Sequence, residues 1–121
     1  MLVKRLQNCS QFEARDRSQL REIVNPNTDN ITIDYSLAWA QVRPGKQTLR
    51  HTLDCWEAYF ILKGTGTMYV DKEKSVVYEN DTVFIPPHAV QFIENTGSEP
   101  LEFLCIVSPP WQPDRERIVA Q

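Results

Sequence analysis

The sequence is poor in the features that mark secreted and membrane-spanning proteins. Only three of its 121 residues are cysteines, and no two form a Cys-x-x-Cys pair, so we expect no disulfide framework. No segment approaches the roughly 18 consecutive apolar residues of a transmembrane helix. The first residues lack the apolar core and the small-residue cleavage site of a signal peptide. We therefore expect a cytoplasmic protein with no membrane partner.

Clustered positive charge is also scarce. The formal net charge is −3, which gives no basic surface for a nucleic-acid partner. The one local group of arginines is interleaved with acidic residues. Its members are Arg15, Arg17 and Arg21, with Glu13, Asp16 and Glu22 between and around them. Such alternation is typical of a solvated face.

The sequence also lacks glycine-rich phosphate loops and the strained turn that carries a nucleophilic serine. It has only two histidines, which leaves little room for a Ser/His/Asp triad. Hydrophobic residues make up 41% of the chain and charged residues 24%, which are ordinary values for a globular protein. A length of 121 residues indicates one domain with a single core.

What the sequence does contain is a series of short β-strand patterns separated by turn residues. Segments rich in β-branched and aromatic residues are bounded by Pro-Gly, Gly-Thr-Gly, Pro-Pro and Thr-Gly turns. The segments are 31–42, 57–62, 67–70, 75–78, 82–85, 91–95 and 101–107. Long helical periodicity is absent. Seven or eight strands at this spacing predict an all-β sandwich or barrel.

We divide the chain into three parts. Residues 31–108 are expected to form the barrel. Residues 1–30 form a polar lead-in that packs on the barrel or on a partner subunit, and within it residues 19–24 fit either one helical turn or a short strand. Residues 109–121 form a tail, in which the segment after Pro113 fits a short helix with proline in its first turn.

Two segments, residues 45–64 and 80–95, carry glycine, histidine, glutamate and proline at a fixed spacing. The matching residues are Gly45, His51, Glu57 and Gly64 in the first segment, and Asp81, Pro86 and Asn95 in the second. In this order and spacing the chain resembles the cupins, whose fold is a double-stranded β-helix, or jelly-roll, barrel. The resemblance covers the body of the chain, and it implies an all-β jelly roll.

The resemblance also implies a metal site. In cupins with complete motifs, histidines and one glutamate point into the barrel and hold Fe, Mn, Ni, Zn or Cu. Here His51 and Glu57 stand at two of the four positions, Leu53 replaces a histidine, and Gln91 replaces another. We therefore predict a divalent metal held by His51, Glu57 and Gln91. Its affinity should be low, because leucine cannot bind a metal and an amide oxygen is a weaker ligand than imidazole.

The same positions make Glu57 and His51 the candidate catalytic residues. A buried Glu57 without a metal would have a raised pKa and could act as a general acid or base. Other roles stay open: His51 as a hydrogen-bonded barrel histidine, Glu57 as a charge at a strand edge, and Gln91 as a hydrogen-bonding group for a substrate. Leu53 is expected to line an apolar pocket wall.

Three nearby residues have simpler interpretations. Asn80 and His88 stand where the family usually has glycine, and asparagine tolerates a positive φ. His88 is expected to be an exposed turn residue. Cys55 is expected to be a small residue in a bend, with a soft metal ligand as its alternative.

Three functions remain open from the sequence. The first is a small-molecule-binding cupin with a divalent metal, which would act as an oxygenase, decarboxylase, isomerase or lyase. The second is a metal-free barrel that binds a sugar or another metabolite. The third is a non-enzymatic sensor with a vestigial site. The resemblance further implies a homodimer, since small cupins often pair through an N-terminal strand or a sheet face.

Overall fold

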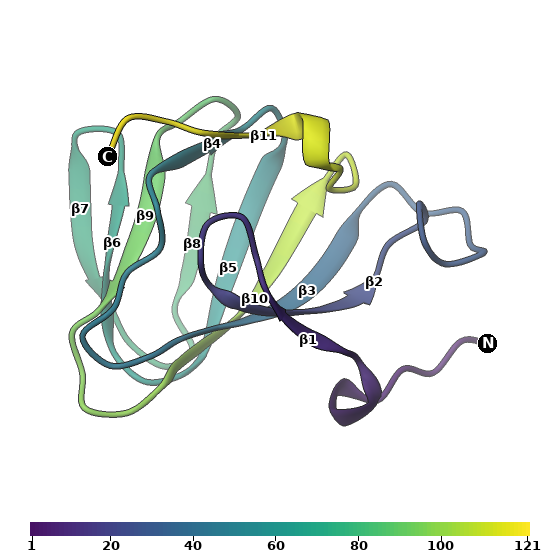
Figure 1. The fold of residues 1–121 in the computed structure, drawn as a ribbon, viewed down its shortest axis with the longest axis horizontal. Helices are drawn as coiled ribbons and strands as arrows, with labels where there is room; N and C mark the ends of the chain where they lie inside the picture. The colour runs from purple at the N-terminus through teal and green to yellow at the C-terminus, as the bar shows by residue number, and fades with distance from the viewer.

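The protein consists of two antiparallel β-sheets packed face to face (Figure 1), in a computed structural model that describes all 121 residues. Sheet A has six strands in the order β1-β2-β3-β10-β5-β8, and sheet B has five in the order β11-β4-β9-β6-β7. The bounds are β1 Gln11–Glu13, β2 Gln19–Val24, β3 Ser36–Val42, β4 His51–Leu53, β5 Trp56–Lys63, β6 Gly66–Val70, β7 Glu73–Val77, β8 Thr82–Ile85, β9 Gln91–Asn95, β10 Leu101–Ser108 and β11 Glu116–Ile118. This arrangement confirms the predicted all-β jelly roll.

The core lies between the two sheets and is built by strand alternation. In β5, Glu57, Tyr59 and Ile61 are buried, and in β10, Phe103 and Cys105 are buried opposite them. Residues at every second position share one face of a strand, so these side chains all enter the barrel. The apolar part of the core is continuous across both sheets. The polar side chains that enter it are therefore exceptions that need partners.

The N-terminal lead-in adds strands to sheet A. The segment 19–24 is the strand β2, which pairs with β3, and β1 pairs with β2. The guanidinium of Arg21 lies 5.5 Å from the ring centre of Trp39 and covers that buried side chain. The hairpin between β1 and β2 thus packs over one end of the barrel.

The C-terminal segment differs from the expected helix. Residues Pro113–Arg115 form one 3₁₀ turn, and β11 follows at once and pairs with β4 at the edge of sheet B. With Leu6–Asn8, this turn is all the helix present, and neither segment has the length to span a membrane. The structure has eleven strands where seven or eight were predicted, because three-residue strands such as β4 and β11 carry little sequence pattern.

Two turns adopt the backbone conformation that the family usually gives to glycine. Asn80 has φ 72° and His88 has φ 70°. Positive φ is tolerated by asparagine, so the prediction for Asn80 is confirmed. His88 is exposed, as expected, and its backbone N–H donates to the carbonyl of Leu53 at 2.7 Å. This bond ties the turn before β9 to β4, the strand that carries His51.

Candidate functional site

A cavity of about 150 Å³ lies inside the barrel, beneath the N-terminal hairpin. Of its 19 lining residues 11 are hydrophobic, and the others include a small set of acidic side chains and one histidine. Leu53 is part of its apolar wall, as expected. Ligand sites in proteins have this character, an apolar hollow with a few convergent polar groups.

One group of polar residues stands at the family's ligand positions and is bonded within itself. The side-chain amide of Gln91 donates from Nε2 to Oε1 of Glu57 at 2.9 Å. The hydroxyl of Tyr59 donates to Oε1 of Gln91 at 3.1 Å. All three residues are at least 94% buried. We call Glu57, Tyr59 and Gln91 the inner network.

Burial changes the protonation of this network. Removal from water raises the pKa of Glu57 to about 8, and the hydrogen bond from Gln91 opposes the shift only in part. Glu57 is therefore mainly a neutral carboxylic acid at neutral pH. Its Oε2 makes no hydrogen bond within the chain, and the residue lines the cavity.

The family's ligand positions offer fewer ligand atoms than the complete motif. Leu53 offers no ligand atom, and the carbonyl oxygen of Gln91 already accepts the Tyr59 hydroxyl. The only hydrogen-bond partner of the Glu57 side chain is the Gln91 amide. A metal at His51, Glu57 and Gln91 would require Glu57 to lose its proton and the Gln91 carbonyl oxygen to use its second lone pair, because the first accepts the Tyr59 hydroxyl. The structure brings Glu57 and Gln91 into contact, and whether they bind a metal stays a prediction.

His51 belongs to a second group. It faces Gln91 across the β4–β9 pair, yet the two side chains share no hydrogen bond. Its Nδ1 lies 2.7 Å from the carbonyl oxygen of Leu49. A carbonyl can only accept, so Nδ1 carries the proton and Nε2 is left free. Nε2 makes no hydrogen bond, and the side chain is only 3% exposed.

Asp16 reaches His51 from the β1–β2 hairpin. Its Oδ1 accepts hydrogen bonds from the backbone N–H of Ser18 at 3.0 Å and from the Ser18 hydroxyl at 2.7 Å. Its Oδ2 points the other way and lies 3.8 Å from Nε2 of His51. The carbonyl of Asp16 accepts the N–H of Leu49 at 2.8 Å, which fixes the hairpin against the strand that carries the histidine.

Glu116 approaches from β11 on the other side. It pairs with Leu53 across β4 and β11, so both side chains point into the barrel. It is 8% exposed, and its Oε1 accepts the indole N–H of Trp111 at 3.2 Å. Burial raises the pKa of Glu116 above its usual value, and the nearby His51 opposes that shift.

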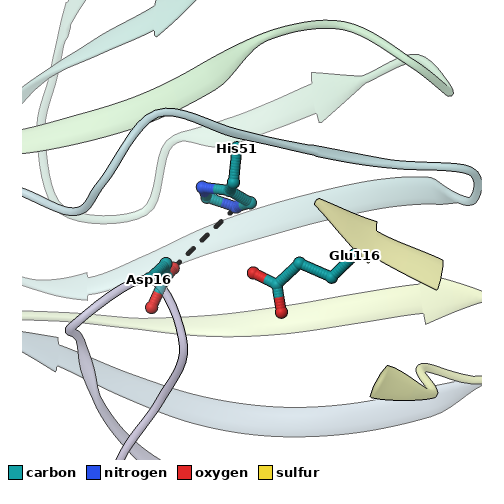
Figure 2. Close-up of side chains that lie close together, drawn as sticks. All are labelled: Asp16, His51 and Glu116. Carbon is teal, nitrogen blue, oxygen red and sulfur yellow. Dashed lines mark ion pairs between the residues drawn. The ribbon is translucent and has the colours of Figure 1, made fainter. Parts of the chain in front are cut away.

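Asp16, His51 and Glu116 together form what we call the terminal cluster. One ligand atom from each residue lies within 4.8 Å of the others, which is a grouping that could hold a metal ion. Figure 2 shows the three side chains pointing toward one another from three separate segments. The inner network is bonded within itself, whereas the terminal cluster has free ligand atoms.

The sequence did not reveal two of these three residues. Asp16 was interpreted as part of a mixed solvated face, and Glu116 as part of a tail. Neither Asp16 nor Glu116 belongs to a recognisable motif, and both lie outside the motif-bearing residues 45–95. One signal was available for Asp16, because Asp-x-Ser is a common turn in which the carboxylate caps the serine N–H.

Cys55 and His88 lie outside the residues that line the cavity. Burial is the main cause that raises the pKa of Cys55 to about 11, so it stays a thiol and a poor metal ligand. His88 lies in its exposed turn, outside the residues that line the cavity.

Comparison with known proteins identifies the family. The model of the cupin domain matches residues 38–107. An uncharacterised protein of Methanocaldococcus jannaschii is 40% identical over 109 residues, which cover 89% of this chain and 86% of that protein. Auxin-binding protein 1 of Arabidopsis thaliana is 33% identical over 82 residues, which cover 60% of this chain and 41% of that protein.

Solved structures agree on the fold. A polyketide cyclase from Streptomyces resistomycificus superposes with a TM-score of 0.82 at 16% identity, over 100% of this chain and 87% of that one. A predicted oxalate decarboxylase from Thermotoga maritima gives 0.77 at 20% identity, over 89% and 99%. At such identities the likeness establishes the fold alone.

Proposed function

Since the chain belongs to the cupin family, we propose that it binds a compact, largely apolar organic molecule inside the barrel, beside His51 and Glu57. The observation that carries this proposal is the largely apolar cavity of about 150 Å³, whose lining includes His51 and Glu57. A dry cavity of similar volume accommodates a ligand the size of benzene. The names of two similar proteins, an auxin-binding protein and a polyketide cyclase, refer to small organic molecules. This supports a ligand of that general kind here.

The polar lining indicates which head group the ligand carries. Glu57 is held neutral by burial, so it donates a hydrogen bond from its free oxygen. Asp16 and Glu116 add further acidic groups to the lining. A carboxylate ligand without a metal counter-ion would meet these groups unfavourably. We therefore expect a neutral carbonyl or hydroxyl next to Glu57.

Small probes test this proposal directly. Cyclohexanone should raise the unfolding temperature and shift the side-chain NMR signals of cavity residues, whereas methylcyclohexane of similar size should bind more weakly. Ala38 lines the cavity, so Ala38→Leu should fill it and weaken cyclohexanone binding at least tenfold. Ala120 is exposed and lies outside the residues that line the cavity, and Ala120→Leu is the matched control. Equal binding to both variants would exclude this cavity as the site.

We also propose that the protein forms a homodimer through the outer face of sheet A. This face is apolar where a solvated face would be polar. Phe84 is 59% exposed, Trp56 54% and Ile106 41%, and the rings of Trp56 and Phe84 stack with their centres 5.5 Å apart. The strand register places Ile106, Ala58 and Phe84 in one row. Because the row carries no charge, its best partner is a second apolar sheet such as its own copy.

Oligomeric state tests the dimer. Phe84→Glu should convert the protein to a monomer in sedimentation equilibrium, since it buries a charge in the proposed interface. Val76→Glu alters an equally apolar residue, 49% exposed, on sheet B and should leave the dimer intact. A concentration of about 100 μM is above the dissociation constants of ordinary dimers. If the wild type sediments as a monomer at that concentration, this proposal is wrong.

A further inference from the structure

We propose that Asp16, His51 and Glu116 form a binding site for a first-row divalent cation such as Mn²⁺ or Zn²⁺, assembled from the two ends of the chain. The site shares only His51 with the family's ligand positions. It goes beyond the proposed binding of an organic molecule, because it concerns a second ligand held by other side chains.

His51 has the geometry of a ligating imidazole. Its Nδ1–H is fixed by the Leu49 carbonyl, which leaves the Nε2 lone pair directed into the cluster. Histidines that bind metals usually donate their other N–H to a backbone carbonyl or a carboxylate, which fixes the tautomer. The side chain is 97% buried and its Nε2 has no hydrogen-bond partner. The Nε2 atom is therefore available to a ligand in the cavity that His51 lines.

Asp16 presents one oxygen to the same point. Ser18 occupies Oδ1 and leaves Oδ2 for an ion. In a tetrahedral zinc site with bonds of about 2.0–2.2 Å, two ligand atoms lie roughly 3.4 Å apart. The observed 3.8 Å between Oδ2 and Nε2 of His51 is within a few tenths of an ångström of that value. A small side-chain rotation would bring the pair to ligand distance.

Glu116 supplies the ligand that position 53 lacks. It lies directly opposite Leu53 on the neighbouring strand, and side chains of such pairs lie about 5 Å apart at Cβ. An oxygen from β11 thus enters the barrel next to the place where the family has a second histidine. Trp111 holds Oε1, and the other oxygen has no hydrogen bond within the chain.

The charge of the cluster favours a cation. No lysine or arginine forms an ion pair with Asp16 or Glu116. Arg15 is near, but its guanidinium donates to the backbone carbonyls of Pro113 and Glu116. Two carboxylates and a neutral imidazole match a divalent ion in charge. Mixed oxygen and imidazole ligation suits Mn²⁺, Fe²⁺ and Zn²⁺ better than Mg²⁺, which prefers oxygen ligands and keeps its water.

Calorimetry with chelator-treated protein and no organic ligand tests the site. We expect one Mn²⁺ or Zn²⁺ per chain and much weaker binding of Mg²⁺. Asp16→Asn and Glu116→Gln keep the shapes and most hydrogen bonds of the native side chains but remove the charges. Each should weaken binding at least about tenfold, since loss of even an outer-shell partner typically costs about 10–100-fold in metal affinity. Asp114→Asn alters an exposed carboxylate close to Glu116 in sequence and should bind as the wild type does.

A second readout comes from Trp111. Since its indole donates to Glu116, an ion at the cluster should change the fluorescence of the wild type, and Trp111→Phe should remove that change while binding persists. Binding that survives Asp16→Asn and Glu116→Gln but is lost in Glu57→Gln would overturn the proposal in favour of the family positions. No binding of either ion to wild type would also overturn it. Neither result would affect the cyclohexanone experiment, so the two proposals fail separately.

Discussion

Glu57 and Tyr59 of the inner network line the same cavity as the terminal cluster, and yet the two groups are built in opposite ways. The inner network comes from the long strands β5 and β9, and its side chains bond to one another. The terminal cluster comes from a hairpin, a short strand and an edge strand, its side chains share no hydrogen bond, and Oδ2 of Asp16 lies 3.8 Å from Nε2 of His51. A barrel can therefore use the family's ligand positions for hydrogen bonding, while free ligand atoms come from the two ends of its chain.

Gln91→Leu should have the largest effect on stability, because it breaks the inner network. Glu57 and Tyr59 would each lose their partner in a buried place. Each unpaired group costs roughly 1–3 kcal/mol, so we expect a loss of about 2–5 kcal/mol in the free energy of unfolding, measured with urea. A change below about 1 kcal/mol would show that the network contributes little, and the contrast with the cluster would disappear.

Glu57→Gln should change how stability depends on pH. The pKa of Glu57 is about 8 in the folded protein against 4.5 ordinarily. Between these values the folded state keeps a proton that the unfolded state has lost. Stability therefore falls as pH rises from about 4.5 to 8, by at most about 1.4 kcal/mol per pH unit from this group, and the fall ends above pH 8.

Glu57→Gln cannot ionise and should flatten that decline in chelator-treated protein. Urea titrations at pH 5, 6, 7 and 8 would measure it, and His88→Gln, at the exposed turn, serves as the control. If both variants follow the wild-type curve, burial does not hold Glu57 neutral.

Leu53→His should restore a ligand at the family position. An added imidazole should raise the affinity for Zn²⁺ about tenfold or more, which is about 1.4 kcal/mol. Calorimetry on the variant checks this. The combination with Asp16→Asn separates the two regions: if the gain persists there, the new histidine works with His51 and the inner network. An unchanged affinity in the single variant would mean that position 53 does not face the ion.

Asp16→Ala should have the smallest effect on stability. Its carboxylate caps Ser18 in a hairpin turn, and loss of such a cap costs about 1 kcal/mol. The expected loss is thus well below that of Gln91→Leu, although the effect on metal binding is large. Urea unfolding of the two variants side by side tests this. A loss as large as that of Gln91→Leu would show that the hairpin is a structural part of the barrel.

The barrel could be predicted from sequence because its long strands alternate and its turns carry distinctive residues. Residues 45–95 placed His51, Glu57 and Gln91 on inner faces, and the structure has all three buried. Their bonding could not be predicted, since spacing fixes a strand register and not the direction of an amide. The roles predicted for His51, Glu57 and Gln91 as metal ligands, and for Glu57 and His51 in catalysis, stay predictions.

The terminal cluster could not be predicted for a different reason. Asp16 and Glu116 are one hundred positions apart, and they come together because β2 pairs with β3 and β11 pairs with β4. Short strands leave almost no pattern, and an acidic residue in a polar segment is ordinarily solvent-exposed. The division into residues 1–30, 31–108 and 109–121 stays a prediction, although β2 and β11 belong to the two sheets.

The strand β11 lies at the edge of sheet B, and the residues after it are bonded to the segment just before His51. The side chain of Gln121 accepts the N–H of Arg50 at 2.8 Å and donates to its carbonyl at 2.9 Å. These bonds have a practical consequence for purification: an affinity tag fused after Gln121 would lie beside β4, the strand that carries His51. A polyhistidine tag there would compete for the same ions. A cleavable tag before Met1, on the exposed segment that precedes β1, leaves that edge undisturbed.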